Sequence, residues 1–203
     1  LTQLFWGGQW HLEIFKKNKD FFSELVGLDL DIQAKPHLRI ARPAKPQDNI
    51  GFHQDTSYGA SAYELSCSIS LTNLNNLSAI QLIPGSHSLT DVKVTAVNNK
   101  ESEKGSIKHQ LGVPYLFKIL ADDNLKSKLI PIPMNIGEVL CFSLAVVHGQ
   151  EVNRGSDTRW SFDARIKNSF IKSGSKNDYY INFDNSPATK AGIMHYKENP
   201  QAK

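Results

Sequence analysis

The chain has 203 residues, of which 40% are apolar and 21% charged, and its formal net charge is +3. This balance is typical of a globular protein and excludes a disordered or fibrous chain. The length suits one hydrophobic core, so we expect a single domain over residues 1–203. The lysines are scattered rather than clustered, which argues against nucleic acid as a partner. Because the sequence has neither a bilayer-spanning apolar run nor a signal pattern, we expect no membrane partner and a cytoplasmic location.

The two cysteines, Cys67 and Cys141, both lie inside apolar runs that are typical of strands. Cysteines in such runs usually act as small buried apolar side chains, and two of them do not make a disulfide framework. We therefore expect free thiols, which fits a reducing cytoplasm.

The expected elements begin with a helix at about 10–28, where apolar residues recur at three- and four-residue spacings. Short runs bounded by Pro, Gly, Asn and Asp follow, and such runs are typical of strands. The expected strands are 37–42, 50–56, 63–72, 79–83, 137–144, 158–167 and 179–183. This pattern predicts an all-β core with flanking helices, and a double-sheet barrel is the favoured architecture.

The segment at about 88–129 differs from its surroundings because it has many charges and few consecutive β-branched residues. We interpret it as a long insertion between core strands, with a short helix near 115–121. Long insertions in compact domains are usually lids, binding loops or disordered segments. A cover for a substrate site is one role that this insertion could have.

Metal-binding chemistry is indicated by His53 and Asp55, which are two residues apart in an expected strand and so leave the same face of it. His148 ends the apolar run 137–147 and is the best candidate for a third ligand. Two imidazoles and one carboxylate form the ligand set of non-haem Fe(II) oxygenases, which leaves coordination positions open. A surface-facing polar pair is the alternative for His53 and Asp55 taken alone.

Arg159 and Ser161 lie on one face of the expected strand 158–167, together with Asp163 and Arg165. If that face points into the barrel, the arginine needs an anionic partner, because an unpaired buried charge is very costly. 2-Oxoglutarate meets the need, since its distal carboxylate can bind Arg159 and Ser161 while its other end chelates iron. Alternation cannot decide which face is inside, and an outward salt bridge of Arg159 is the alternative.

Four motifs together resemble the phytanoyl-CoA dioxygenase-like family of Fe(II)- and 2-oxoglutarate-dependent oxygenases. They are HQD at 53–55, PGSH at 84–87, HG at 148–149 and NRGSDTRWSFDAR at 153–165. The resemblance implies a double-stranded β-helix (the jelly-roll, cupin-like fold). It also implies iron at His53, Asp55 and His148, and 2-oxoglutarate at Arg159 with help from Ser161. For the PGSH motif itself we expect no more than a turn.

The expected function is a 2-oxoglutarate-dependent dioxygenase that uses O2, hydroxylates a small molecule and releases succinate and CO2. The metal ligands carry the chemistry, and no further catalytic residue is assigned. Candidates for substrate contacts near the iron are Arg42, Gln54, Tyr58 and Trp160. Two other classes stay open: a jelly-roll protein that binds a metal or a sugar without redox chemistry, and a metal-dependent isomerase or hydrolase on the same fold.

Overall fold

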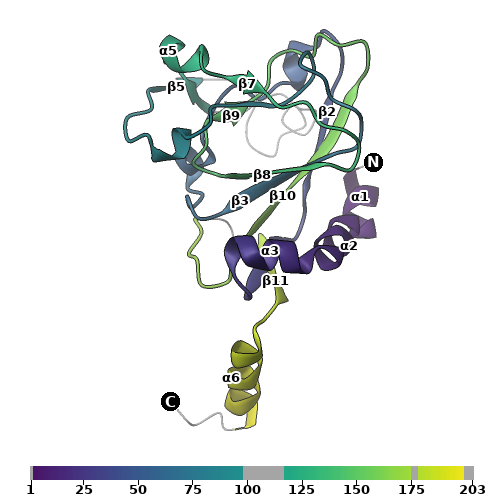
Figure 1. Ribbon diagram of the computed structural model, residues 1–203, viewed down its shortest axis with the longest axis vertical. Helices are drawn as coiled ribbons and strands as arrows, with labels where there is room; N and C mark the ends of the chain where they lie inside the picture. The colour runs from purple at the N-terminus through teal and green to yellow at the C-terminus, as the bar shows by residue number, and fades with distance from the viewer. Residues whose placement is uncertain (1, 98–116, 175–177, 199–203) are drawn as a thin grey trace.

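The computed structural model describes residues 2–97, 117–174 and 178–198, and antiparallel sheets form its centre (Figure 1). The strands are β1 (Leu30–Gln33), β2 (His37–Ala41), β3 (Leu65–Ser70), β4 (Gln81–Leu82), β5 (Val94–Val97), β6 (Phe117–Leu120), β7 (Ile130–Pro131), β8 (Val139–Ser143), β9 (His148–Gly149), β10 (Arg159–Asn168) and β11 (Tyr180–Asp184). The larger sheet has the order β11-β1-β10-β3-β8, with β2 also paired to β10. The smaller sheet has the order β7-β4-β9, and β5 pairs with β6.

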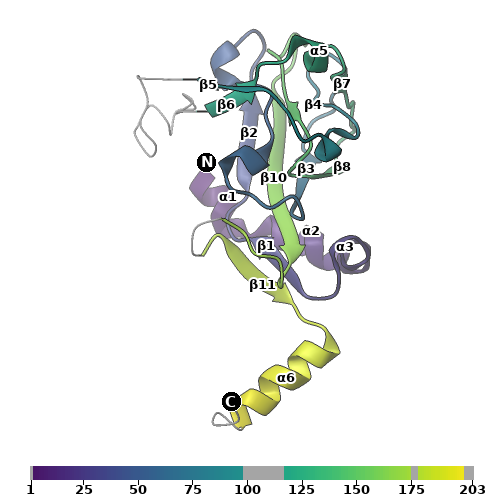
Figure 2. The same ribbon diagram turned by 90° about the vertical axis from the view of Figure 1, so that its left-hand side faces the viewer.

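The long strand β10 is the centre of the larger sheet and runs along the body of the molecule (Figure 2). One edge of β10 is shared by two strands, because β2 pairs with residues 159–163 and β1 with residues 166–168. Its other edge pairs with β3 along residues 161–166. By pairing with β1, β2 and β3, the strand β10 joins the C-terminal half of the chain to the N-terminal half in one sheet.

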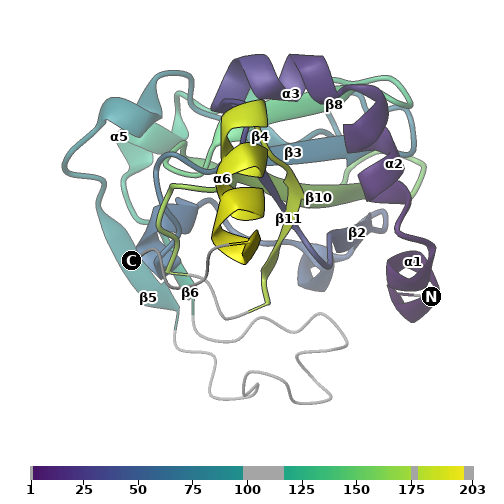
Figure 3. The same ribbon diagram turned by 90° about the horizontal axis from the view of Figure 1, so that it is seen from below.

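Helices cover one face of the larger sheet and so decide which side chains face the interior. The α-helices are α1 (Thr2–Gly8), α2 (Trp10–Lys17), α3 (Lys19–Val26), α5 (Asp123–Lys126) and α6 (Pro187–Glu198). Figure 3 shows α2 and α3 alongside β3 and β8. Phe15 and Phe22 of these helices pack on Ala164 and Ile166 of β10 and on Cys67 of β3. Each such phenylalanine contributes about 1.5–3 kcal/mol by leaving water.

The polar residues of the same strands face the other way, because successive side chains of a strand point to opposite faces. On β3 these are Ser66, Ser68 and Ser70, all buried. On β10, Ser161 and Asp163 lie directly opposite Ser70 and Ser68. The interior of the barrel is therefore lined by polar side chains, which suits a site rather than a dry core.

The helix expected at about 10–28 is two helices, α2 and α3, separated at Asn18. Asn18 leaves the helical conformation, with φ −115° and ψ 26°. Its side-chain amide and its backbone amide both donate to the carbonyl of Ile14, at 2.8 and 3.2 Å. Asparagine competes with the helical backbone in this way, and the periodicity continues across the break because both helices pack on the same sheet.

The segment at about 88–129 is described only in part, since residues 98–116 lie outside the described residues. The short helix expected near 115–121 is wrong for its described residues, because Phe117–Leu120 form strand β6, paired with β5. A helical turn follows at α5, where the Asp122 carboxylate accepts from the amides of Asn124 and Leu125. The role of this segment as a cover stays a prediction.

Both cysteines are free, as expected. Cys67 and Cys141 face each other across β3 and β8, with 3.6 Å between their sulfur atoms. Cys67 is fully buried in the core beneath α2 and α3.

In the described part of the chain, no helix combines the length and the apolar character needed to cross a membrane. Helix α6 projects beyond β11 and has no buried residue (Figures 1 and 2).

Candidate metal centre

His53 and His148 are held opposite each other by their backbones, in an isolated antiparallel bridge. The amide of each donates to the carbonyl of the other at 2.9 Å. His148 opens β9, and a turn through 144–147 separates β9 from β8. The apolar run 137–147 thus contains β8, and His148, which ends the run, begins β9 in a different sheet. The turn between them carries His148 across to His53.

Asp55 begins a 3-10 turn, η2 (Asp55–Tyr58), so the strand expected at 50–56 is wrong beyond the bridge at His53. Turn hydrogen bonds replace a strand ladder here, and Gly59 ends the turn with φ 92°, a conformation that favours glycine. Gln54 stays extended, with φ −112° and ψ 132°. His53 and Asp55 therefore still leave the chain on the same side.

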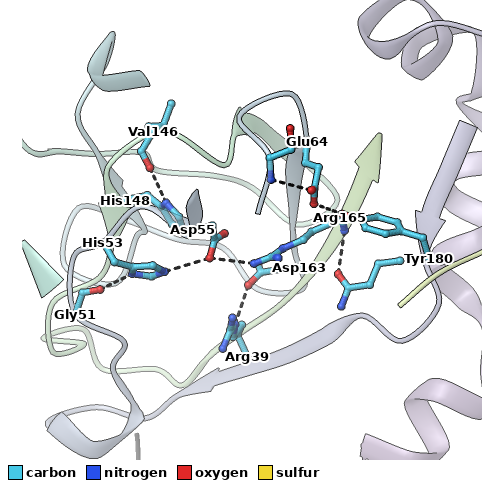
Figure 4. A network of polar contacts seen from close by, with 12 residues as sticks. Arg39, Gly51, His53, Asp55, Glu64, Val146, His148, Asp163, Arg165 and Tyr180 are labelled. Atoms are coloured by element: carbon cyan, nitrogen blue, oxygen red, sulfur yellow. Dashed lines mark hydrogen bonds and ion pairs between the residues drawn. The ribbon is translucent and has the colours of Figure 1, made fainter. Parts of the chain in front are cut away.

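The side chains of His53, Asp55 and His148 converge, with one donor atom from each within 4.8 Å of the others (Figure 4). Nε2 of His53 lies 3.6 Å from Oδ1 of Asp55, and Nε2 of His148 lies 3.9 Å from Oδ2. All three side chains are at most 13% exposed. Two imidazoles and one carboxylate on one side of a metal suit iron, and they leave positions open for other ligands.

Each imidazole is oriented by a backbone carbonyl behind it. Nδ1 of His53 lies 2.7 Å from the carbonyl of Gly51, and Nδ1 of His148 lies 2.9 Å from that of Val146. A carbonyl only accepts hydrogen bonds, so Nδ1 of each ring must carry the proton. The lone pair of Nε2 then points toward Asp55, which is the arrangement that metal-binding histidines use.

The protonation states of the cluster also suit a metal. Burial and the neighbouring His53 lower the pKa of His148 to about 4, against the opposing effect of Asp55. Burial raises the pKa of Asp55, but the neighbouring His53 and the charge of Arg165 outweigh burial and hold that pKa well below its usual range. His148 is therefore neutral and Asp55 ionised at neutral pH, as metal ligands must be.

Arg159 is a buried cation without a full set of partners. Its residue is 5% exposed, and within the described residues its Nε and Nη1 atoms have no hydrogen-bond partner. Its Nη2 donates to Ser161 Oγ at 3.4 Å. Burial lowers the pKa of Arg159 to about 10, with Asp163 opposing the shift, so the side chain is still charged at neutral pH. Such a group needs an anion, and a carboxylate matches the guanidinium fork.

The polar face of β10 points inward, which the sequence had left undecided. Nη2 of Arg165 lies 2.9 Å from Oδ1 of Asp55, and Nε of Arg39 donates to Asp163 at 2.8 Å (Figure 4). Arg159 and Ser161 belong to the same face and are both buried. The outward salt bridge considered for Arg159 is therefore wrong, because Asp163 pairs with Arg39 and Arg159 is inside.

Two of the four candidates for substrate contacts lie beside the metal centre. The ring of Tyr58 is 5.9 Å from that of His53, edge to face, and Tyr58 is 39% exposed. Gln54 connects His53 to Asp55, and its side-chain amide donates to the carbonyl of Ala145 at 2.6 Å. Tyr58 is thus a partly exposed aromatic residue beside His53, whereas the Gln54 side chain is bonded to the turn that carries His148.

The other two candidates lie away from the cluster. Arg42 has a 53% exposed side chain that forms two hydrogen bonds with Asp48, at 2.9 and 2.7 Å. Trp160 lies on the face of β10 opposite to Ser161, because neighbouring side chains of a strand alternate. The assignment of these two residues to the iron mouth is not supported.

The PGSH turn contributes more than the expected change of chain direction. Gly85 has φ 76°, and the next residue, Ser86, opens the turn η3 (Ser86–Ser88). The buried Ser86 hydroxyl donates to the carbonyl of Ile83 at 2.7 Å and accepts from the amide of Val147 at 2.8 Å. Val147 precedes His148, so Ser86 anchors the chain beside a candidate metal ligand. This role of Ser86 was not predicted from the sequence, and the polar serine within the PGSH motif is the feature that could have indicated it.

The fold and the convergent side chains define a jelly-roll protein, an antiparallel barrel with flanking helices, that has a two-histidine, one-carboxylate cluster inside it. The chain belongs to the phytanoyl-CoA dioxygenase (PhyH) family, which matches it over residues 22–161. This confirms the resemblance and the expected fold. A search among curated proteins gave no match.

Solved structures with similar folds include three with TM-scores above 0.5. The non-heme monooxygenase ThoJ has a TM-score of 0.60 and 19% identity, over 82% of this chain and 57% of its own. EvdO2 from Micromonospora carbonacea var. aurantiaca, complexed with 2-oxoglutarate, has a TM-score of 0.53 and 15% identity, over 74% and 57%. The alpha-ketoglutarate-dependent epimerase SnoN from nogalamycin biosynthesis has a TM-score of 0.51 and 16% identity, over 80% and 68%. The chain thus spans just over half the length of the first two.

Proposed function

We propose that this chain forms the catalytic core of an Fe(II)- and 2-oxoglutarate-dependent oxygenase that hydroxylates a small molecule. The observation that carries the proposal is the buried guanidinium of Arg159, whose Nε and Nη1 have no hydrogen-bond partner among the described residues, in the barrel whose interior also holds the histidine–aspartate cluster. A metal site alone has no use for such a cation. A metal site with a dicarboxylate co-substrate does, because one carboxylate chelates the metal and the other binds the arginine.

In this proposal, the iron ligands are His53 and His148 through Nε2 and Asp55 through a carboxylate oxygen. When bound, iron and 2-oxoglutarate supply the oxidising chemistry, which consumes O2, releases succinate and CO2 and leaves a hydroxyl group on the substrate. The protein holds the two imidazoles and an ionised carboxylate in place before the metal arrives. The carbonyls of Gly51 and Val146 keep the rings from turning.

The co-substrate is held at its distal carboxylate by Arg159, with the Ser161 hydroxyl as a second donor. The 3.4 Å contact between their side chains brings both donors to one place. The pairing also relieves a cost, since a buried charge without a partner destabilises the ligand-free protein. Binding of 2-oxoglutarate should therefore stabilise the fold strongly.

The substrate we propose is a small molecule that enters on the side of Tyr58, the exposed aromatic residue whose ring meets that of His53. The similar structures include a monooxygenase and an epimerase. Hydroxylation is thus the finer part of the proposal. The mass of the product separates the two outcomes, because hydroxylation adds one oxygen atom and epimerisation leaves the mass unchanged.

Two readouts test the proposal. Anaerobic addition of Fe(II) and 2-oxoglutarate should give a weak visible charge-transfer band, and admission of O2 with a panel of metabolites should release succinate. Arg159→Leu should lose both the band and succinate release. Arg154→Leu is the matched control, because Arg154 is an exposed arginine paired with Glu151 and should leave both readouts intact. Absence of the band and of succinate with the unaltered chain would overturn the proposal.

The alternatives without redox chemistry give different results in the same assay. A jelly-roll protein that binds only a metal or a sugar would show metal binding with no effect of 2-oxoglutarate on thermal stability. A metal-dependent isomerase or hydrolase would keep its activity in Arg159→Leu. The unpaired guanidinium favours the oxygenase over both, since neither alternative supplies an anion for it.

A further inference from the structure

Asp55 forms an ion pair with Arg165, which follows the residues matched by the family model. Nη2 of Arg165 is 2.9 Å from Oδ1 of Asp55, and the two side chains are 19% and 13% exposed. The same oxygen lies 3.6 Å from Nε2 of His53, whereas Oδ2 lies 3.9 Å from Nε2 of His148. The match to the family ends at residue 161, four residues before this arginine. Arg165 therefore contacts a candidate metal ligand directly.

Arg165 is itself held in place by Tyr179, the residue immediately before β11. Its guanidinium carbon lies 5.7 Å from the centre of the Tyr179 ring, a cation–π contact. The next residue, Tyr180, donates from its hydroxyl to the fully buried carboxylate of Glu64 (Figure 4). A second oxygen of Glu64 accepts from the amide of Ser61 at 2.9 Å. These contacts fix the strand that supports the arginine.

β11 is also fixed as a strand, by its pairing with β1 along the edge of the larger sheet. The carbonyl of Tyr179 accepts from the amide of Ala34 at 2.9 Å, and the amide of Arg165 donates to the Gln33 side chain at 3.1 Å. Three elements thus converge on Arg165: β1 and β11 behind it and η2, with Asp55, in front of it. An arginine with this support can hold a carboxylate in one orientation.

Orientation matters here because Asp55 stands at the start of a short 3-10 turn rather than in a strand. A carboxylate that is free to rotate can bind a metal through both oxygens and so occupy a second coordination position. With one oxygen engaged by Arg165, one oxygen is left for the metal. Removing a residue that hydrogen-bonds to a metal ligand typically weakens metal binding by about 10–100-fold.

We propose that Arg165, supported by Tyr179, is a positioning residue that holds Asp55 as a one-oxygen metal ligand. This inference rests on the proposed metal site. The positive charge of Arg165 by itself would repel a divalent cation, so charge and orientation predict opposite results. If orientation dominates, removing the arginine weakens metal binding; if charge dominates, removal strengthens it.

Anaerobic titration of the metal-free protein with Co(II), as a spectroscopic substitute for Fe(II), tests this inference through the dissociation constant and the visible spectrum. Arg165→Met should raise the dissociation constant about 10–100-fold and weaken the visible bands, because a second bound oxygen increases the coordination number. Arg165→Lys keeps the charge but has no planar fork, so it should recover part of the affinity. Tyr179→Leu should cause a smaller loss in the same direction.

Arg39→Met is the matched control, because the partly exposed Arg39 forms a 2.8 Å ion pair with Asp163 on the same face of the sheet, and no contact recorded for the described residues joins it to a candidate ligand. It should leave the dissociation constant within about twofold, and its thermal unfolding calibrates the loss of an interior ion pair. Equal or tighter Co(II) binding by folded Arg165→Met and Arg165→Lys would overturn the inference. Absence of Co(II) and Fe(II) binding by the unaltered chain would instead overturn the proposed function.

Discussion

His53 and His148 are joined through their backbones by two hydrogen bonds of 2.9 Å, one in each direction. The distance between the two imidazoles is therefore set by main-chain pairing and does not depend on a bound ion. Their ring centroids are 4.6 Å apart, and each ring is fixed by a carbonyl behind it. A preformed pair of this kind implies that the fold persists when the metal is removed.

The first prediction concerns Asp55→Ala, which should abolish Fe(II) binding and leave the far-ultraviolet circular dichroism unchanged. Within the described residues, the carboxylate is the one anionic group of the cluster, whereas the bridge between the histidines does not involve it. The metal-free variant should lose about 1–3 kcal/mol of stability, because Arg165 is left without its carboxylate partner. A collapse of the secondary structure would show that Asp55 serves the fold rather than a metal.

Arg159→Leu provides the second prediction, which concerns the ligand-free protein. A buried guanidinium with two unpaired nitrogens is a cost to the fold, and replacing it by an apolar side chain should leave the melting temperature unchanged or raise it. The same variant should bind 2-oxoglutarate at least about 30-fold more weakly, or about 2 kcal/mol. Calorimetry and a melting curve with and without the co-substrate measure both effects. A large drop in the ligand-free melting temperature would assign Arg159 a structural role.

The third prediction is a loss of stability in acid, to which His37 contributes. Burial, with the charges of Arg39 and Arg165, lowers the pKa of His37 from 6.5 to about 4. The unfolded chain therefore binds a proton between pH 6.5 and 4 that the folded chain does not. The contribution of His37 to stability is complete above that window and is lost as the pH falls through it, by about 3 kcal/mol.

Urea unfolding of the metal-free protein at several pH values measures this effect. His37→Gln should reduce the slope of stability against pH but not remove it, because His148 also has a pKa lowered to about 4. His87→Gln is the control, since His87 is exposed in the turn after Gly85 and should leave the slope unchanged. An unaltered slope in His37→Gln would contradict the prediction.

The sequence predicted the residues of the site whose side-chain chemistry suits iron or 2-oxoglutarate and whose spacing is typical of a strand. The convergence of His53, Asp55 and His148 was expected from residue type and spacing, and Arg159 and Ser161 were correctly placed on one face of their strand. Alternation left open which face is inside, and the structure shows that this face points inward. The strands β2, β3, β8, β10 and β11 were also expected at nearly their observed positions.

The contacts that the sequence did not predict depend on features that no local pattern encodes. Asp55 lies in a turn because Gly59 and the interior around it override the strand tendency of the run. Arg165 was placed on the correct face, but its partner, Asp55, lies 110 positions earlier, and only the register of β10 brings the two together. Strand β1 was missed because its four residues are too few to show a period.

The last prediction separates two serines of one turn. Ser86 is buried and its hydroxyl links Ile83 to Val147, whereas the exposed Ser88 hydroxyl donates only to the carbonyl of Gly85, at 2.8 Å, among the contacts recorded for it. Ser86→Ala leaves the Val147 amide buried without a partner, so it should cost about 1–3 kcal/mol. Ser88→Ala should cost less than about 0.5 kcal/mol, as changes of exposed residues usually do.

Because Val147 immediately precedes His148, Ser86→Ala should also weaken metal binding, while Ser88→Ala should not. Urea unfolding gives the two stabilities, and Co(II) titration gives the two dissociation constants. A loss of stability in Ser86→Ala with unchanged metal affinity would mean that the backbone bridge to His53 holds His148 unaided. A loss of both would place the PGSH serine among the residues that build the site, since its hydroxyl then fixes the segment from which a metal ligand extends.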